Sequence, residues 1–189
     1  MKVITDVREE KIGGEGAFVE IDETLVHKRK YNRGRLLFNE SKQRWVVGGI
    51  QRGTNKVFAE YVEDRKADTL CDIILRNVLP GSVIATDQWK AYQRIEDHGF
   101  ILYQVNHSQN FVDPNNPLIH TQNIERNWLT LKETIPKHTH GEPRETYLVE
   151  HLYRRKYFGK NPSENFKTIL NDIAVCYPGA FGLSNNVIL

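Results

Sequence analysis

The chain has little cysteine and no long apolar run, and these shortages narrow the classes of protein to which it can belong. Its two cysteines, Cys71 and Cys176, form no C-x-x-C pair, so the sequence predicts neither a zinc ribbon nor a disulfide framework. Both stand among apolar residues, and we expect them to be buried thiols in a reducing compartment. No stretch approaches the roughly 20 apolar residues of a membrane span, and the charged amino terminus lacks the apolar run of a signal peptide. We therefore expect a soluble, intracellular protein with no membrane partner.

A large net charge is also missing, because 26 Lys and Arg against 24 Asp and Glu leave a formal charge of +2. The positive charges are nevertheless clustered. The main cluster has no acid within it and consists of Lys28, Arg29, Lys30, Arg33 and Arg35. A second, smaller cluster at 154–156 falls in a predicted helix. Local basic patches can follow the phosphates of a nucleic acid even when the net charge is small. A solvated loop or a localisation signal is the alternative.

The order of the predicted elements indicates an α/β domain with a mixed sheet flanked by helices. Residues rich in β-branched and aromatic side chains predict strands over 17–25, 45–50, 56–62, 82–86 and 101–105. Helical spacing predicts helices over 67–79, 88–98, 121–135, 144–158 and 163–175. The predicted loops include 27–35 and 106–119. This order is that of the ribonuclease H-like fold.

Three acidic residues stand where carboxylates can converge. Asp22 lies inside a β-prone run, where Asp is disfavoured unless it has a partner or a metal. Asp87 closes a later apolar run, although an Asp before a helix is also a favoured N-cap. Glu125 lies on the helix predicted over 121–135. Carboxylates at strand ends can meet at one edge of a sheet, where two hard divalent cations would need oxygen ligands for in-line displacement at a phosphodiester.

The helix over 121–135 carries an apolar stripe that we expect to face the core, formed by Ile124, Trp128, Leu131 and Ile135. Glu125 lies about 90° from this stripe, Asn123 is about as far away on the opposite flank, and Gln122 is nearly behind it. Only one flank of this helix can face Asp22 and Asp87, and a carboxylate is a better ligand for Mg²⁺ than an amide oxygen. We therefore expect Glu125 near both aspartates and Trp128 buried. Lys132 should emerge beside Glu125, where it contacts a phosphate or is simply solvated.

Two histidines are candidates to support such a site. His107 lies in the predicted loop and His120 directly precedes the predicted helix, so both could approach the cleft of the three acids. They would position the scissile phosphate or orient a carboxylate, and packing within the loop is an equal alternative. The other five histidines show no convincing metal-ligand spacing.

Seven segments in consistent order resemble the ISXO2-like transposase domain, and their amino-acid sequences are most similar to those of the Merlin-type DNA transposases of eukaryotes. The resemblance covers roughly residues 12–160. The segments are VEIDET (19–24), RKYNRGR (29–35), WVVGGI (45–50), DRKADTL (64–70), TDQWKAY (86–92), VNHSQNFVDP (105–114) and HTQNIE (120–125). A resemblance of this length is far more specific than any single motif.

This resemblance implies a ribonuclease H-like core with a sheet of about five strands and a DDE triad of Asp22, Asp87 and Glu125 that binds two Mg²⁺ or Mn²⁺ ions. Some bacterial relatives have an asparagine near the third position, so Asn123 and Gln122 remain open as substitutes. The implied function is metal-dependent cleavage and strand transfer at transposon ends. The implied partners are transposon-end DNA, target DNA and further copies of the chain, in the nucleus if the host is eukaryotic.

The resemblance also implies a division of the chain into a lead-in segment (1–16), a catalytic domain (17–160) and a C-terminal helical extension (161–189). Full-length relatives carry an amino-terminal nucleic-acid-binding region, whereas about 16 residues precede the first predicted strand here. We therefore expect an isolated catalytic domain, a truncated copy or a host-retained derivative. The alternatives are a non-catalytic, host-retained DNA-binding protein and a ribonuclease H-like nuclease.

Overall fold

The structure, a computed structural model, describes residues 11–28, 43–54, 56–87, 90–105, 119–135, 145–159 and 161–177. Several of the predicted functional residues lie outside this part of the chain. They are Arg29, Lys30, Arg33, Arg35 and His107, and of Lys28 the backbone alone is described.

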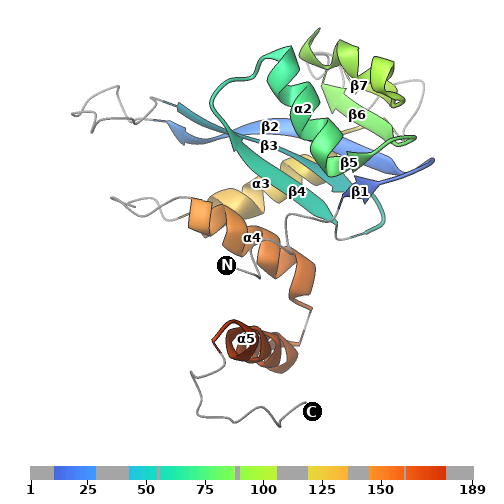
Figure 1. Ribbon diagram of the computed structural model, residues 1–189. Helices are drawn as coiled ribbons and strands as arrows, with labels where there is room; N and C mark the ends of the chain where they lie inside the picture. Colours follow the sequence, from blue (N-terminus) through green and yellow to red (C-terminus); the bar gives the residue numbers. More distant parts are fainter. Residues whose placement is uncertain are drawn as a thin grey trace.

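One mixed sheet of five strands has the order β4-β3-β2-β6-β7 (Figure 1). The strands are β2 (Phe18–Lys28), β3 (Gln43–Gln51), β4 (Val57–Val62), β6 (Val83–Asp87) and β7 (Ile101–Val105). The first three pair antiparallel as neighbours, whereas β6 runs parallel to both β2 and β7. The prediction of a mixed sheet of about five strands is confirmed, and β2 lies at its centre.

Strand β2 extends further than its sequence suggests. The prediction that a loop begins at residue 27 is wrong, because His27 pairs with Arg44 and Lys28 pairs with Gln43 beyond an irregularity in the ladder. The backbone hydrogen bonds of β3 thus continue β2 through residues whose side chains are too polar to indicate a strand. The basic stretch starts at the end of a strand as a result.

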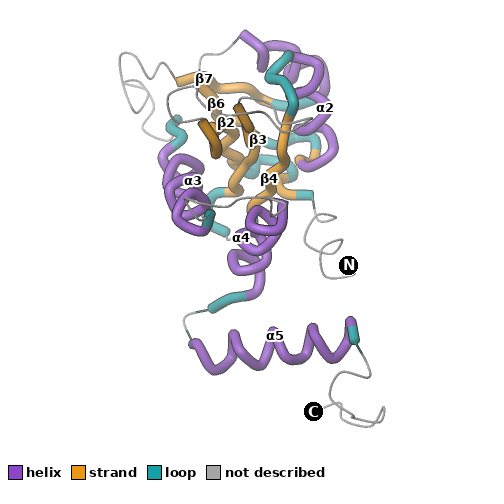
Figure 2. The backbone as a smooth tube through the Cα atoms, turned by 90° about the vertical axis from the view of Figure 1, so that its left-hand side faces the viewer, coloured by secondary structure: helices purple, strands orange, loops and turns teal. Residues whose placement is uncertain are grey.

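Helices cover both faces of the sheet (Figure 2). On one face lie α2 (Ala67–Asn77) and the 3₁₀ helix η2 (Lys90–His98), and on the other lie α3 (Gln122–Thr134) and α4 (Glu145–Tyr157). The predicted end of α2 is two residues late, since 78–79 form β5 (Val78–Leu79), which pairs with β1 (Ile12–Gly13). Ile12 is buried there, so the segment expected as a lead-in contributes to the core.

Because side chains alternate along β2, the strand contributes to two separate apolar cores on opposite faces of the sheet. Val19 and Ile21 pack with α2 and η2 residues such as Tyr92 in one core, whereas Trp128 and Leu131 of α3 pack on β3 in the other. Residues of β2 with even numbers therefore point toward α3. This alternation decides on which side of the sheet each acid of β2 lies.

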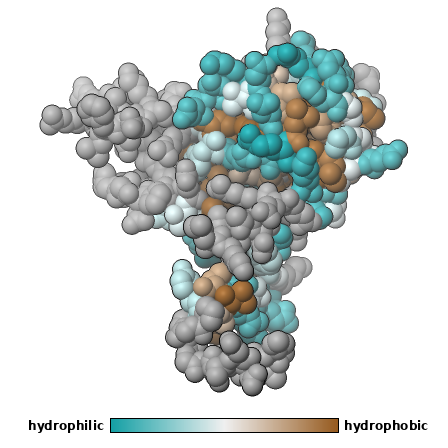
Figure 3. All heavy atoms as spheres, viewed as in Figure 1, coloured by the Kyte–Doolittle hydropathy of each residue, from teal (hydrophilic) through white to brown (hydrophobic). Residues whose placement is uncertain are grey.

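Helix α5 (Pro162–Cys176) lies beyond α4, away from the sheet (Figures 1 and 2). None of its residues is buried, and Phe166 and Val175 are largely exposed. Hydrophobic residues are accordingly visible on the lower part of the molecule in Figure 3. The expectation of a buried thiol is therefore confirmed for Cys71 and wrong for Cys176, which is half-buried on α5. No helix in the described residues is long and apolar enough to cross a membrane.

Candidate active site

Strands β2 and β6 carry the two predicted aspartates to neighbouring positions. Glu20 pairs with Ala85 in the parallel ladder, and Asp22 and Asp87 each follow two residues later. Because residues two apart in a strand point to the same face, the two aspartates lie on one face where the ladder ends. Burial raises the pKa of Asp22 to about 6, and the negative charge of Asp87 contributes to that rise.

Helix α3 brings the third predicted acid to this place. The indole Nε1 of Trp128 donates a hydrogen bond to Asp22 Oδ2 at 3.0 Å, which ties the middle of α3 to β2. The charge of Glu125 also raises the pKa of Asp22, and the Thr121 hydroxyl donates to Glu125 Oε1 at 3.0 Å. Trp128 is buried, as expected from the apolar stripe. The structure thus places Asp22 and Asp87 on one face of the sheet, and Glu125 lies close enough for its charge to act on Asp22.

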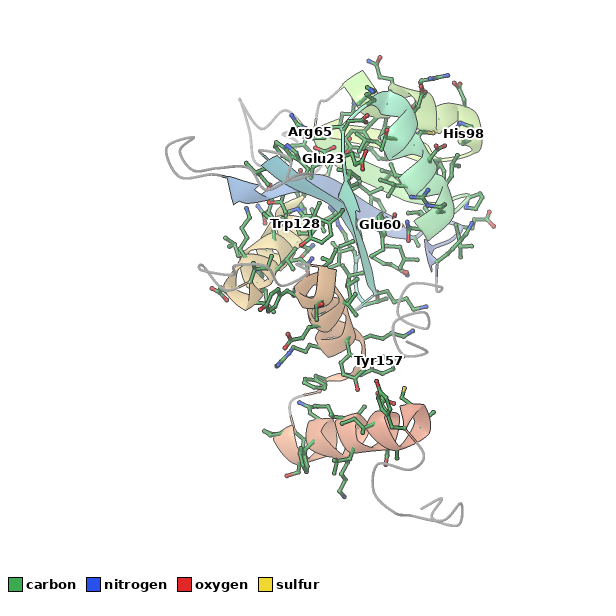
Figure 4. The ribbon with its side chains drawn as sticks, turned by 60° about the vertical axis from the view of Figure 1, so that its left-hand side comes forward. Glu23, Glu60, Arg65, His98, Trp128 and Tyr157 are labelled. Atoms are coloured by element: carbon green, nitrogen blue, oxygen red, sulfur yellow. The ribbon has the colours of Figure 1, made fainter. Side chains whose placement is uncertain are left out.

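A glycine makes room for the contact between Trp128 and Asp22. Gly48 of β3 is paired with Asp22, and a Cβ atom there would lie 2.6 Å from the Trp128 ring and 2.5 Å from the Phe58 carbonyl oxygen. The indole therefore packs directly on the backbone of β3, on the α3 side of the sheet (Figure 4). A glycine inside a strand indicates such a close approach, and the Gly48-Gly49 pair in the sequence was the available signal.

Glu20 has a structural role that the sequence analysis missed. Its carboxylate is fully buried and accepts hydrogen bonds from the backbone N–H groups of Asn123 (2.8 Å) and Ile124 (3.1 Å) at the start of α3. It also accepts from Asn123 Nδ2 (2.7 Å) and Arg52 Nε (2.6 Å). A carboxylate is the favoured partner for the free N–H groups and positive dipole of a helix start. Glu20 therefore fixes the end of the helix that carries Glu125.

Two predicted supporting residues contact Glu20. Asn123 donates to Glu20 with its backbone and its side chain. His120 Nδ1 lies 3.3 Å from Glu20 Oε1 but makes no hydrogen bond with it, and burial followed by the charge of Arg52 lowers the pKa of His120. The His120 carbonyl oxygen accepts a hydrogen bond of 2.6 Å from Arg52 Nη2. Lys132 is exposed in the last turn of α3.

A further acid of β2, Glu23, lies on the opposite face of the sheet and is hydrogen-bonded by the hydroxyl group of Tyr92. Burial raises its pKa to about 7, the charges of Asp87 and Asp22 add to the rise, and Arg65 opposes it. Figure 4 shows Glu23 and Arg65 close together on the α2 side, whereas Trp128 lies on the other side. The Arg65 guanidinium stacks on the Trp45 ring at 3.7 Å. Strand alternation along β2 therefore separates Glu23 from Asp22.

The three acids of the candidate site fit a hard divalent cation in their chemistry. Among the residues that the structure describes, no three His, Cys, Asp or Glu side chains are arranged closely enough to hold a metal ion. The donors are nevertheless carboxylate oxygens, the ligands that Mg²⁺ and Mn²⁺ prefer. Burial, with a further contribution from the charges of Asp87 and Glu125, raises the pKa of Asp22, and a bound cation would offset this cost.

In the metal-free protein, Asp22→Asn is expected to stabilise the fold at pH 7.5. The folded pKa of about 6 exceeds the ordinary value of 3.8, so the folded state binds more protons than the unfolded state between these pH values. Stability therefore falls as the pH rises through this window, by at most about 3 kcal/mol. Asparagine removes that cost and can still accept the hydrogen bond from Trp128. Thermal denaturation in EDTA should show a higher Tm for the variant at pH 7.5 and a smaller difference at pH 4.5.

The control for this measurement is Asp72→Asn, which removes one negative charge from an exposed position on α2. We expect its Tm to stay close to that of the parent protein at both pH values. A Tm for Asp22→Asn that is equal to or below the parent's at pH 7.5 would contradict the destabilisation that burial and neighbouring charge impose on the Asp22 carboxylate.

Solved integrase structures share this fold. The catalytic core domain of BIV integrase has a TM-score of 0.51 at 16% identity, covering 85% of this chain and 97% of that chain. The catalytic core domain of HTLV-2 integrase in complex with magnesium has a TM-score of 0.53 at 14% identity, with coverages of 79% and 92%. A simian T-cell lymphotropic virus intasome in complex with PP2A regulatory subunit B56 gamma has a TM-score of 0.52 at 15% identity, with coverages of 78% and 51%. These similarities show a ribonuclease H-like fold.

Sequence comparison gives the family directly. No curated protein matches the chain. The ISXO2-like transposase domain, in contrast, matches residues 9–156, from before β1 to the end of α4. That range includes the whole mixed sheet, both aspartates and the helix that carries Glu125. The chain therefore belongs to the ISXO2-like transposase domain family.

Proposed function

We propose that this chain is the catalytic domain of a DDE-type, Merlin-type DNA transposase that cleaves DNA at transposon ends and transfers the cut strand to target DNA. The observation that supports this most is geometric: Asp22 and Asp87 lie at neighbouring positions of β2 and β6 on the α3 face of the sheet, and Trp128 of α3 donates a hydrogen bond to Asp22. A shared cluster of three carboxylates on a ribonuclease H-like sheet is what metal-dependent phosphoryl transfer requires.

The three carboxylates would hold two Mg²⁺ or Mn²⁺ ions. Bound there, the ions would activate the attacking water or 3′-hydroxyl and neutralise charge on the attacking and leaving oxygens. Trp128 orients the carboxylate of Asp22 through its hydrogen bond and covers it with an apolar ring. Thr121 orients Glu125, and Glu20 holds the first turn of α3 in place. Cleavage and strand transfer would use the same carboxylates in two successive displacements.

Glu125 is the better candidate for the third acid. The amide of Asn123 is already hydrogen-bonded to Glu20, whereas the charge of Glu125 reaches Asp22. Gln122 is exposed at the first position of α3. A carboxylate also binds Mg²⁺ better than an amide oxygen does.

The basic residues that follow β2 would hold the DNA backbone, with Lys132 adding a contact from α3. Such phosphate contacts position DNA without carrying sequence information. We propose that residues 17–160 form the catalytic domain, preceded by a lead-in segment and followed by a helical extension over 161–189. We also propose that the active form is a homo-oligomer, since two of the similar structures are a trimeric form and an intasome. In a eukaryotic host it would act in the nucleus.

This chain is expected to bind DNA with little sequence preference and with strong salt dependence. About five phosphate contacts, from Lys28, Arg29, Lys30, Arg33 and Arg35, should give a slope of log K against log salt near −4 to −5. Fluorescence anisotropy with two unrelated duplexes over a range of salt concentrations measures this slope. Tight, salt-insensitive binding of one duplex alone would show that a sequence-reading module has been missed.

An assay with model transposon ends and target plasmid in Mn²⁺ tests the proposed function. A DDE transposase should nick the end and then join its 3′-hydroxyl to the plasmid. Cleavage without strand transfer would indicate a ribonuclease H-like nuclease instead. DNA binding without any cleavage would indicate a non-catalytic, host-retained DNA-binding protein.

A further inference from the structure

A pocket rich in arginine lies apart from the three acids, between the turn after β3, the first half of α3 and the end of α4. Its volume is about 180 Å³, and three guanidinium groups line it, those of Arg52, Arg126 and Arg155. No aspartate or glutamate is among the described residues that line it. We name it the arginine pocket. Three like charges around one hollow repel one another unless an anion lies between them.

The first of these arginines is already neutralised. Arg52 forms an ion pair of 2.6 Å with the buried Glu20. Within the described part of the chain, neither Arg126 nor Arg155 forms an ion pair with a carboxylate. Burial lowers the pKa of Arg155, which reflects the cost of holding its charge away from water without an anion. The pocket therefore has a surplus of positive charge on two of its walls.

Two buried donors of the pocket also lack an acceptor. Asn127 is 1% exposed, its Oδ1 lies 3.0 Å from His151 Nε2, and its Nδ2 has no hydrogen-bond partner among the described residues. Burial, followed by the charge of Arg155, lowers the pKa of His151 to about 4, so the ring is neutral at pH 7. In the orientation that the structure gives the Asn127 amide, the Nε2–H tautomer of this ring donates to Oδ1. Arg155 Nε is likewise buried and unpaired within the described residues. A buried donor without an acceptor is destabilising, so an acceptor is missing from this place.

The free N–H groups at the start of α3 are not what would attract an anion into this pocket. Its first free N–H groups, at Asn123 and Ile124, already donate to Glu20, as does the side chain of Asn123. The anion attraction of the arginine pocket thus comes from side chains that no other group of the described structure satisfies. Planar guanidinium groups pair with the oxygens of phosphate in particular, because several N–H groups can donate to one oxyanion.

We propose that the arginine pocket binds a phosphate group, which Arg126, Arg155 and Asn127 would hold through their N–H groups. The phosphate is either a phosphodiester of the DNA backbone or a free phosphate, and the two sources share this chemistry. Binding of free phosphate is independent of the proposed transposase function, whereas the DNA source rests on it.

Thermal denaturation with inorganic phosphate tests the site itself, with chloride at matched ionic strength as the reference. At ten times the Kd, phosphate should raise the Tm of the parent protein by about 3–5 °C. Arg126→Gln and Arg155→Gln should each lose most of this rise. Arg154→Gln is the matched control, because Arg154 is exposed on the same helix and paired with Glu150. Asp22→Asn should keep the rise even if all DNA cleavage is absent.

An unchanged Tm of the parent protein in phosphate would overturn the proposal, and so would an equal rise in all variants. The Tm of each variant in phosphate is compared with the Tm of the same variant without phosphate, so a change in basal stability does not affect the measured rise. Anisotropy with a DNA duplex then identifies the source. If the pocket binds the DNA backbone, Arg126→Gln should reduce the salt slope by about 1 relative to Arg76→Gln, which removes an exposed arginine of α2 that is paired with Glu60. If the phosphate response is lost and DNA affinity is unchanged, the ligand is a free phosphate.

Discussion

Metal-dependent cleavage should fall by at least about a thousandfold when Asp22 or Asp87 is replaced by asparagine. An amide matches the shape of the carboxylate but loses the negative charge that would hold a divalent cation. In Asp22→Asn the hydrogen bond from Trp128 can persist, so α3 should stay in place. Single-turnover cleavage of a labelled model end in Mn²⁺ measures the effect on the chemical step.

The same assay with Asp72→Asn controls for the loss of one acidic charge far from the three acids. We expect this variant to cleave at the parental rate, and we expect both active-site variants to keep weak DNA binding and a cooperative melting transition. Cleavage at a near-parental rate in either Asp22→Asn or Asp87→Asn would contradict the assignment of these residues.

The second large effect concerns stability. Arg52→Met should lower the free energy of unfolding by about 3–5 kcal/mol, because it leaves the carboxylate of Glu20 buried without its cation. Glu20 is fully buried and holds the start of α3, so its unpaired charge would disturb the helix that carries Glu125. Urea denaturation of the purified variants measures the difference.

The double variant Glu20→Gln with Arg52→Met should be more stable than Arg52→Met alone, since a neutral amide costs less to bury than an unpaired carboxylate. Arg76→Met is the control. Its ion pair with Glu60 is exposed, and its loss should change the free energy of unfolding by less than about 1 kcal/mol. Equal effects of Arg52→Met and Arg76→Met would show that Glu20 does not depend on Arg52.

Much of the fold was predictable from the sequence, because local patterns and the buried faces agree. The alternation along 18–25 placed Glu20 and Asp22 opposite Glu23, and the 3.6-residue spacing identified the stripe that buries Trp128. The errors lie where tertiary pairing overrides local composition. The ladder with β3 extends β2 through His27 and Lys28, and pairing with β1 turns 78–79 into a strand.

The supporting parts of the site were not predictable in the same way. The pairing of Glu20 with Arg52 and with the start of α3 joins residues that are 32 and 103 positions apart. No local pattern signals such a contact. Arg126 and Arg155 likewise come from separate helices and meet only when α4 packs beside α3.

Diffraction from crystals soaked in Mn²⁺ tests the central claim most directly, since anomalous scattering locates the metal without assumptions about the reaction. We expect a Mn²⁺ peak in contact with carboxylate oxygens of Asp22 and Asp87, and with Glu125 within reach of the same cluster. That peak should disappear in Asp22→Asn crystals grown under the same conditions. Mn²⁺ bound elsewhere, with the carboxylates of Asp22 and Asp87 contacting no metal, would contradict the account.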